Sequence, residues 1–317
     1  MKHQILALAV AALSFTACTN EDNISQDYLA DTPIKLNVSV DEPTTRAGYS
    51  NEDKPTGFVL SVQHSENEND KYNYDVWAEW EDNNWKTYDY EQYAADKTKK
   101  EVTMLWANMT DKVSVTAFTN FGEITIPTAQ TSDEQLKQAD VLYLPSDEIA
   151  PREDGINVNL QHAMSKINLT IELGSEYEFS KEDVDLKIKD VKIDGSLVSG
   201  DFPGMNNLSG APTPITPLHT GATPFSKDAN GTITKASATY EAILIPQTIA
   251  SGKFTVSFKV DGKLYEWVYN NEAGLTLDPA TAYTLKLIAG DDKVQPVSFS
   301  VAEWGKGNGE GENKETD

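Results

Sequence analysis

The stretch IKLNVSVDEPTTRAGYS, residues 34–50, indicates the fold of this chain and raises a question about it. Its first part alternates polar residues with apolar ones, which are Ile34, Leu36, Val38 and Val40. A period of two predicts a β-strand over 34–40 with one face in a core. Arg46 follows six residues later in a small, polar, turn-prone segment. The sequence therefore predicts a core strand followed directly by a site that a trypsin-like protease would cut.

The N-terminus resembles a bacterial lipoprotein signal. A short basic start precedes an apolar run over 5–13, which has the length of a signal-peptide core and is too short to span a membrane as a mature helix. Two small residues then precede Cys18, the only cysteine of the chain. Phe15 departs from the leucine that is commonest at this position of such signals. We interpret Cys18 as the site of lipidation with a palmitate-type anchor.

The segments that flank this cysteine fit the same interpretation. We expect residues 1–17 to be a signal peptide and residues 18–31 to be an acidic tether, because the latter segment is too polar to build a core. With no second cysteine, the chain has no disulfide framework.

Composition excludes some classes of function. The chain has 317 residues and a formal net charge of −24, which argues against binding to nucleic acid or to anionic membranes. No other segment approaches 18 consecutive apolar residues, so we expect the rest of the chain to be soluble and outside the cytoplasm.

Alternating runs dominate both halves of the chain. In the first half, strands are predicted over 58–62, 72–80, 101–106, 113–118 and 123–127. In the second half, they are predicted over 185–195, 239–246, 254–260, 263–270, 282–289 and 297–304. The dipeptide Asp261-Gly262 joins two of these runs and is a strong hairpin signal.

Other segments carry weaker signals. In 156–173 the apolar residues switch from even to odd positions across His162–Lys166, so one straight strand would need a bulge or bend there. Residues 199–236 are rich in Gly, Pro, Thr and Ser and predict a long loop with little regular structure. The segment 132–139 is the best helix candidate, with Ser132 as its cap.

These patterns predict an all-β protein made of two β-sandwiches in tandem. The prolines and the charge run of 141–155 mark the expected boundary between them. The N-terminal sandwich would occupy 32–150 and the C-terminal one 155–304, and 305–317 would be a disordered polar tail.

The residues that carry most enzyme chemistry form no convincing pattern. The four histidines have none of the spacings of zinc sites, and there is neither a phosphate-binding loop nor a nucleophile elbow. His162 lies in an apolar neighbourhood and is interpreted as structural. The acidic segment 67–75 would offer oxygen ligands to Ca²⁺, but a solvated loop explains it better. We therefore expect no enzyme activity, no cofactor and no bound metal.

Trp77, Trp80 and Trp85 form the one concentration of aromatic residues that suggests binding. Exposed aromatic faces bind sugar rings or partner surfaces. Trp77 and Trp80 would lie on opposite faces of a strand, so the simpler interpretation is that at least one of them belongs to the core.

Four features together resemble the fimbrillin family of Bacteroidales, the subunits of protease-assembled surface pili and their relatives. The first two are the signal that ends at Cys18 and the strand with TTRAG around Arg46. The others are LQHAMSKINLTIEL at 160–173 and AYTLKLIAGDDKVQPVSFSVAEW at 282–304. The resemblance spans nearly the whole chain, and the order and spacing of the features are more specific than any one of them.

The resemblance implies that the two sandwiches are transthyretin-like. It also implies that an arginine-specific surface protease cuts between Arg46 and Ala47, removes the strand over 34–40, and leaves a groove for a strand from a neighbouring subunit. Its partners would be other pilus subunits, the protease, and a glycan or protein on a host or bacterial surface. The protein would lie at the outer membrane, on the cell surface or in a fimbrium, with a role in adhesion.

One departure concerns the C-terminus, which ends GKGNGEGENKETD with no apolar residue for a donor strand. The only terminal candidates, Val297, Phe299, Val301 and Trp304, would then belong to the last strand of the second sandwich. Such a chain would accept a strand but donate none, as a tip or accessory subunit. Two alternatives remain open: a monomeric glycan-binding lipoprotein of the same fold, and a hydrolase that uses two carboxylates.

Overall fold

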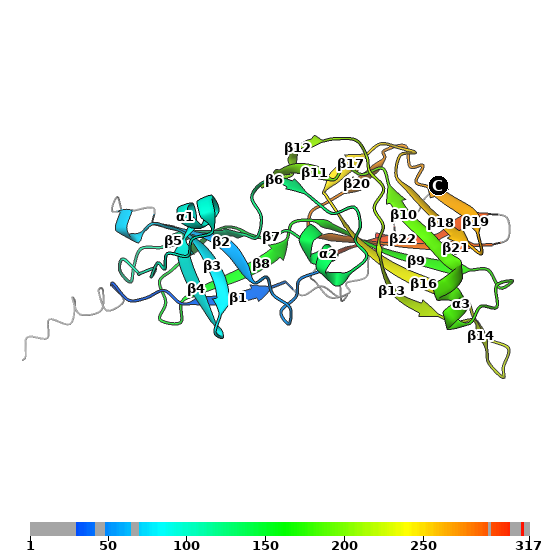
Figure 1. Cartoon of the computed structure of the whole chain (residues 1–317), viewed down its shortest axis with the longest axis horizontal. Helices are drawn as coiled ribbons and strands as arrows, with labels where there is room; N and C mark the ends of the chain where they lie inside the picture. The colour runs from blue at the N-terminus through cyan, green and yellow to red at the C-terminus, as the bar shows by residue number, and fades with distance from the viewer. Residues whose placement is uncertain (1–29, 42–47, 65–69, 291–292, 305–311, 314–317) are drawn as a thin grey trace, which may run out of the picture.

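The computed structural model describes residues 30–41, 48–64, 70–290, 293–304 and 312–313. This part of the chain is mostly β and forms several sheets. The molecule is elongated, and its strands gather towards two ends that have separate hydrophobic cores (Figure 1).

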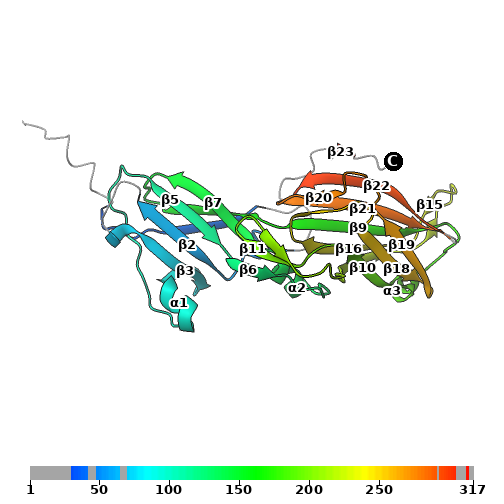
Figure 2. The same ribbon diagram turned by 90° about the horizontal axis from the view of Figure 1, so that it is seen from above.

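A seven-stranded sheet surrounds the first core, in the order β1-β8-β7-β5-β2-β3-β4. Its strands are β1 Leu36–Val40, β2 Gly57–His64, β3 Tyr74–Glu81, β4 Asn84–Asp89, β5 Val113–Phe118, β7 Leu142–Ile149 and β8 Ile156–His162. Two short helices accompany it, η1 Asp70–Tyr72 and α1 Tyr90–Asp96. All of these strands except β4 place alternate apolar side chains in one buried cluster, which Met104 and Trp106 help to fill. Figure 2 shows β7, β5, β2 and β3 side by side.

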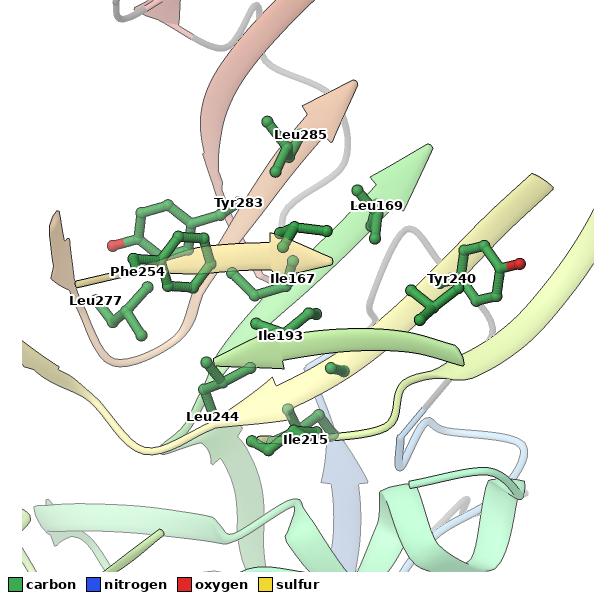
Figure 3. Packing of buried hydrophobic residues seen from close by; sticks show 14 of the residues in the cluster. Ile167, Leu169, Ile193, Ile215, Tyr240, Leu244, Phe254, Leu277, Tyr283 and Leu285 are labelled. Carbon is green, nitrogen blue, oxygen red and sulfur yellow. The ribbon is translucent and has the colours of Figure 1, made fainter. Parts of the chain in front are cut away.

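The second core lies mainly between a six-stranded sheet, β13-β16-β9-β21-β22-β23, and a three-stranded sheet, β10-β18-β19 (Figure 3). The six strands are β9 Ser165–Leu173, β13 Leu218–Thr223, β16 Ser237–Leu244, β21 Thr281–Ala289, β22 Val294–Glu303 and β23 Glu312–Asn313. The three are β10 Ile188–Asp194, β18 Thr255–Val260 and β19 Lys263–Val268.

Smaller elements complete this end of the molecule. The pairs are β14 Ser226–Lys227 with β15 Ile233–Thr234, and β17 Gln247–Ile249 with β20 Leu275–Leu277. A further sheet joins β6 Gly122–Thr125 to β11 Ser199–Phe202 and β12 Asn206–Ser209. The helices are α2 Asp133–Ala139 and α3 Lys181–Lys187.

Several predicted elements are confirmed. Residues Asp261 and Gly262 both have positive φ, at 50° and 85°, as the tight turn between β18 and β19 requires. The helix predicted over 132–139 is α2, and the Ser132 side chain accepts a hydrogen bond from the Gln135 N–H.

Other predictions were wrong. Residues 101–106 make only isolated bridges, because Met104 and Trp106 fill the core without joining a ladder. The segment 141–155, expected to break the pattern, contains β7, whose Leu142 and Leu144 face the core while its second half is mostly exposed. Residues 199–236 hold five short strands, not an irregular loop. The start of the strand expected over 185–195 belongs to α3.

The switch of apolar face at 162–166 marks a passage between two sheets. β8 pairs with β1 and β7 around the first core, whereas β9 pairs with β16 and β21 around the second. We expected 155–304 to form the C-terminal sandwich, but β8 lies with the strands of the first half. In turn β6 and α2, both inside 32–150, pack with the second core through Ile124 and Leu136. The two halves of the sequence therefore interlock at their junction.

Candidate functional site

Strand β1 lies at one edge of the seven-stranded sheet, opposite β4, and is the centre of the candidate site. It runs parallel to β8, with Leu36 opposite Ile156 and Val40 opposite Leu160 (Figure 1). Ile34, Val38 and Val40 are buried in the first core, and Leu36 packs against it half-buried. The alternation predicted from the sequence is thus present, and it makes β1 part of the core although the strand lies at an edge.

Polar side chains form a second set of contacts on the outer face of β1. The Asn37 amide group donates to Asn157 Oδ1 at 3.2 Å and to the Asp154 carbonyl at 2.8 Å. Ser39 Oγ donates to Asn159 Oδ1 at 2.9 Å, and the Asn159 amide group donates to Asp41 Oδ1 at 2.8 Å. We call these contacts between β1 and β8 the polar ladder.

The chain between β1 and β2 is pinned at Tyr49. The Tyr49 N–H donates to Asp140 Oδ2 at 2.9 Å, and Asp140 Oδ1 lies 2.9 Å from His162 Nδ1. Asp140 and His162 are both buried, and Gly48 lies so close that a Cβ on it would come within 2.8 Å of Asp140 Oδ2. This agrees with the interpretation of His162 as structural, because its ring joins three segments of the chain.

A buried ion pair lies beside this junction. Lys166 Nζ is 2.9 Å from Glu241 Oε2, and the Lys166 side chain is fully buried. Burial lowers the pKa of Lys166, although Glu241 and Asp140 oppose the shift. Trp304 stacks on His162 and lies under the Lys166 ammonium group at 5.7 Å.

Cys18, Arg46 and Ala47 lie outside the described residues. The described chain leaves β1 at Asp41 and resumes at Gly48, so Arg46 and Ala47 belong to the connection between the strand and the pinned Tyr49.

The C-terminal run is part of the six-stranded sheet. β22 pairs antiparallel with β21 from Val294 to Glu303. Phe299 and Trp304 are buried in the second core, Val301 packs against it, and Val297 is exposed. Phe299, Val301 and Trp304 therefore pack in a core of their own chain, and Val297 does not.

The three tryptophans have different environments. Trp80 is 48% exposed, and its ring centroid lies 5.4 Å from that of Trp85. Both rings line a hollow of about 360 Å³, whose other wall is the segment 51–56. Trp85 also packs against the first core, in an edge contact with Phe58. Trp80 and Trp85 thus form one surface site.

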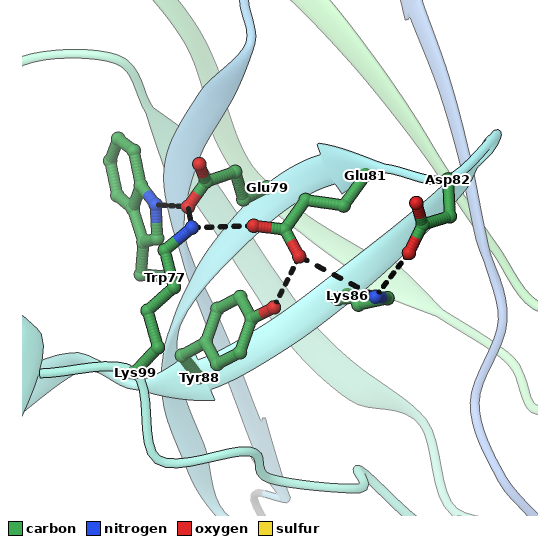
Figure 4. Close-up of polar contacts among 7 residues, drawn as sticks. All are labelled: Trp77, Glu79, Glu81, Asp82, Lys86, Tyr88 and Lys99. Carbon is green, nitrogen blue, oxygen red and sulfur yellow. Dashed lines mark hydrogen bonds and ion pairs between the residues drawn. The ribbon is translucent and has the colours of Figure 1, made fainter.

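Trp77 lies apart from this hollow, on the opposite face of β3. Its ring stacks on Tyr93 of α1 at 4.7 Å, and its Nε1 donates to Glu79 at 3.0 Å. Lys99 binds both Glu79 and Glu81, and this network holds the pKa of Glu81 at about 2 (Figure 4). Neither Trp77 nor Trp80 is a buried core residue; Trp85 is the one in contact with the core.

Clusters of metal-ligating side chains and membrane-spanning helices are both absent from the described residues. No group of three or more His, Cys, Asp or Glu side chains there is close enough to hold a metal ion. None of the helices in this part of the chain is long and apolar enough to cross a membrane.

Sequence reasoning missed several contacts around β1. The polar ladder depends on Asn157 and Asn159, and the pinned segment depends on Asp140. A weak signal did exist, because polar residues alternate with apolar ones in both strands, Asn37 and Ser39 in β1 and Asn157 and Asn159 in β8. Nothing in the sequence places these two strands side by side.

This chain is similar to known proteins in sequence and in structure. The model of the fimbrillin-like family matches residues 45–304. A candidate cell adhesion protein from Bacteroides ovatus is similar in structure, with a TM-score of 0.54 and 14% identity, over 87% of this chain and 98% of that one. The tip fimbrial protein Mfa3 of Porphyromonas gingivalis, truncated at its C-terminus, has a TM-score of 0.45 and 10% identity, over 80% and 95% of the two chains. No curated protein sequence matches the chain.

The chain belongs to the fimbrillin-like family, as its sequence features suggested. This family is one of cell-surface proteins and is not a family of enzymes. The structural likeness to the Bacteroides ovatus protein supports the shared fold alone.

Proposed function

We propose that this chain is a surface-exposed pilus subunit that accepts a strand from a neighbouring subunit after proteolysis. An arginine-specific surface protease cuts between Arg46 and Ala47, β1 leaves, and a strand of the neighbour takes its place. The observation that carries the proposal is the position of β1, an edge strand that fills the first core and is followed by a short connection containing an arginine.

The buried side chains of the strand over 34–40 determine how much stability is lost when this strand leaves. Burial of one aliphatic side chain is worth about 1.5–3 kcal/mol, and Ile34, Val38 and Val40 are buried. Because the net stability of a whole domain is only about 5–15 kcal/mol, loss of β1 removes a large share of it. The vacated edge would expose apolar surface and unpaired backbone, which favours pairing with another strand.

A tip or accessory position fits better than a place in a repeating stalk. A stalk subunit must also donate a strand, and Phe299 and Val301 of β22 pack in the second core of their own chain. In this proposal Cys18 carries the lipid of the precursor at the outer membrane, and two tandem transthyretin-like sandwiches form the mature subunit.

The experiment is to determine the N-terminal residue of the protein taken from the cell surface. We expect Ala47 in the wild type and an uncut chain in Arg46→Ala. Arg46→Lys is the matched control, since an arginine-specific protease would spare it while trypsin would not. A wild-type chain that starts at Cys18 in assembled pili would contradict the proposal.

Lipidation is tested separately with Cys18→Ala. We expect this variant to take up no fatty-acid label and to be released from the membrane fraction. Uptake of label by the variant would assign the anchor to another residue.

A second candidate function is glycan binding at the hollow beside Trp80 and Trp85. Its support is the exposed Trp80 ring, which adjoins the polar side chains of 51–56. Trp80→Ala should abolish saturable binding on a glycan array and leave the melting temperature unchanged. Phe121→Ala is the control, because this ring is also exposed, at 60%, but lies outside the hollow. Equal loss in both variants would rule out a specific site.

A further inference from the structure

We propose that Asn51 and Lys54 form a clasp that holds the backbone of whichever strand occupies the position of β1. This inference rests on the proposed strand exchange and assigns two residues of the acceptor to it. In the precursor the clasp retains the strand of the chain itself, and after exchange it holds the incoming strand.

The argument begins with the direction of the backbone groups of β1. Successive residues of a strand point their N–H and C=O groups to opposite sides. Ile156 N–H donates to the Lys35 carbonyl at 2.8 Å, and Asp41 N–H donates to the Leu160 carbonyl at 2.9 Å. The backbone N–H and C=O groups of the odd-numbered residues therefore point towards β8. The same groups of the even-numbered residues point away from β8, beyond the edge of the sheet.

The clasp binds this outward side. The Val40 N–H donates to Asn51 Oδ1 at 2.9 Å, and Lys54 Nζ donates to the Val38 carbonyl at 2.6 Å. At the start of the segment, Ile34 N–H donates to the Met104 carbonyl at 2.8 Å. The Asn51 and Lys54 side chains and the Met104 backbone thus satisfy groups with which an added strand would otherwise pair.

The clasp is held by the body of the protein and not by β1. Ser50 and Asp53 exchange backbone hydrogen bonds at 3.1 and 3.2 Å, and the tight turn that these bonds close contains Asn51 and directly precedes Lys54. Asp53 forms an ion pair with Lys137 of α2, and Tyr49 is bound to Asp140. A cut after Arg46 therefore leaves the clasp in place when β1 departs.

The clasp and the polar ladder recognise different things. Asn51 and Lys54 bond main-chain atoms, which every strand offers except at proline. The ladder bonds the side chains of Asn37 and Ser39 and so depends on sequence. It follows that the clasp accepts any extended segment with apolar residues at the inward positions, and that the ladder selects among such segments.

The first test uses the uncut, full-length chain. Amide hydrogen exchange is followed by NMR in the wild type, in Asn51→Ala and in Glu52→Gln. Glu52 is an exposed neighbour in the same turn and serves as the matched control. The loss of one hydrogen bond should raise the exchange rate of the Val40 amide roughly two- to tenfold in Asn51→Ala. The Ser39 amide, which faces β8, should not change.

The second test follows exchange itself. The full-length protein is cut after Arg46 with an arginine-specific protease, and a fluorescent peptide of residues 32–41 is added. A second peptide carries an ester in place of the amide between Ser39 and Val40, so that it lacks the N–H that Asn51 accepts. In the wild type, the ester peptide should dissociate faster than the amide peptide. In Asn51→Ala this difference should shrink by roughly two- to tenfold, because the partner of the N–H is already absent.

Lys54→Met tests the other half of the clasp. It removes the donor to the Val38 carbonyl and should speed release of both peptides by the same factor, roughly two- to tenfold. Glu52→Gln should leave all rates at their wild-type values.

Each outcome decides one statement. An unchanged Val40 amide in Asn51→Ala would overturn the clasp in the precursor. Equal ester penalties in the wild type and Asn51→Ala would overturn its role with an incoming strand, even if peptides exchange. Absence of any exchange in the cut wild type would instead overturn the proposed strand exchange, and the amide measurement would still decide whether the clasp holds β1.

Discussion

The ring of His162 stacks on that of Trp304 with centroids 3.9 Å apart and planes within 9° of each other. His162 is the last residue of β8, around the first core, and Trp304 directly follows β22, a strand of the six-stranded sheet at the second core. His162 also contacts Asp140, which holds the Tyr49 backbone. One buried cluster therefore joins the strands of the first core, the strands of the second core and the chain that follows β1.

Replacement of His162 by Phe should preserve the stacking on Trp304 and remove the partner of Asp140. A buried polar group without its partner costs about 1–3 kcal/mol, and we expect the free energy of unfolding to fall by that amount. Urea unfolding followed by tryptophan fluorescence measures it. His219→Phe is the control, since His219 is exposed and its replacement should change stability by less than about 0.5 kcal/mol. Similar effects in both variants would contradict the role of the cluster.

Substitution of Val38 by Asp should expel β1 from the first core. The change loses the burial of Val38, about 1.5–3 kcal/mol, and would bury an unpaired carboxylate if the strand stayed. We expect a lower melting temperature for the first core and rapid exchange of the Asp41 amide. Lys35→Asp introduces the same charge at an exposed position of the same segment and should have little effect. Equal melting temperatures in the two variants would mean that β1 adds nothing to the core.

His64 should make the protein less stable in mild acid. It is 5% exposed, and both ring nitrogens lack hydrogen-bond partners among the described residues. Burial lowers the pKa of His64, although Asp111 opposes the shift. A lowered pKa means that the unfolded chain takes up a proton first, so stability is full above about pH 6.5 and falls as the pH decreases below it.

The measurement is urea unfolding between pH 8 and pH 5 in the wild type and in His64→Leu. The slope assigned to this histidine is at most about 1.4 kcal/mol per pH unit, and it should vanish in the variant. Identical slopes in both proteins would show that His64 is protonated equally in the folded and unfolded chains.

Glu81 should remain ionised at a pH where most glutamates are protonated. Its hydrogen bonds to Lys99 and Tyr88 hold its pKa at about 2. NMR titration of the side-chain carboxyl should show this value in the wild type and a value nearer 4.5 in Lys99→Met. Lys100→Met is the control, because Lys100 pairs with Asp89 and should leave Glu81 unchanged. An ordinary wild-type pKa would mean that the Lys99 contact does not persist in solution.

Local patterns predicted the strands that have one buried face and a regular ladder, such as β2 and β5. They failed where a segment is buried without regular strand pairing, or is paired without being buried. Met104 and Trp106 alternate like strand residues but fill the core from a segment with isolated bridges. In β7 the core-facing half is followed by a charged half that still pairs with β5, so its composition suggested a loop.

The site was predicted in part for a similar reason. The inward residues of β1 follow from their own alternation. The partner of β1 is more than a hundred residues away, and no local pattern encodes which strand an edge will join. Asn51 and Lys54 were missed because their role is to bond backbone atoms, which gives no sequence complementarity to detect.

The shared direction of β1 and β8 has a mechanical consequence. When the N-terminal side of β1 and the chain beyond the C-terminal end of β8 are pulled apart, the force acts along both strands. The backbone hydrogen bonds between β1 and β8 are then loaded in shear, all at once. They do not open one after another, as they would in a hairpin whose strands are peeled apart. Forced separation depends on the barrier to this joint rupture. A strand from a neighbour that ran in the direction of β1 would join two subunits with the same resistance to tension.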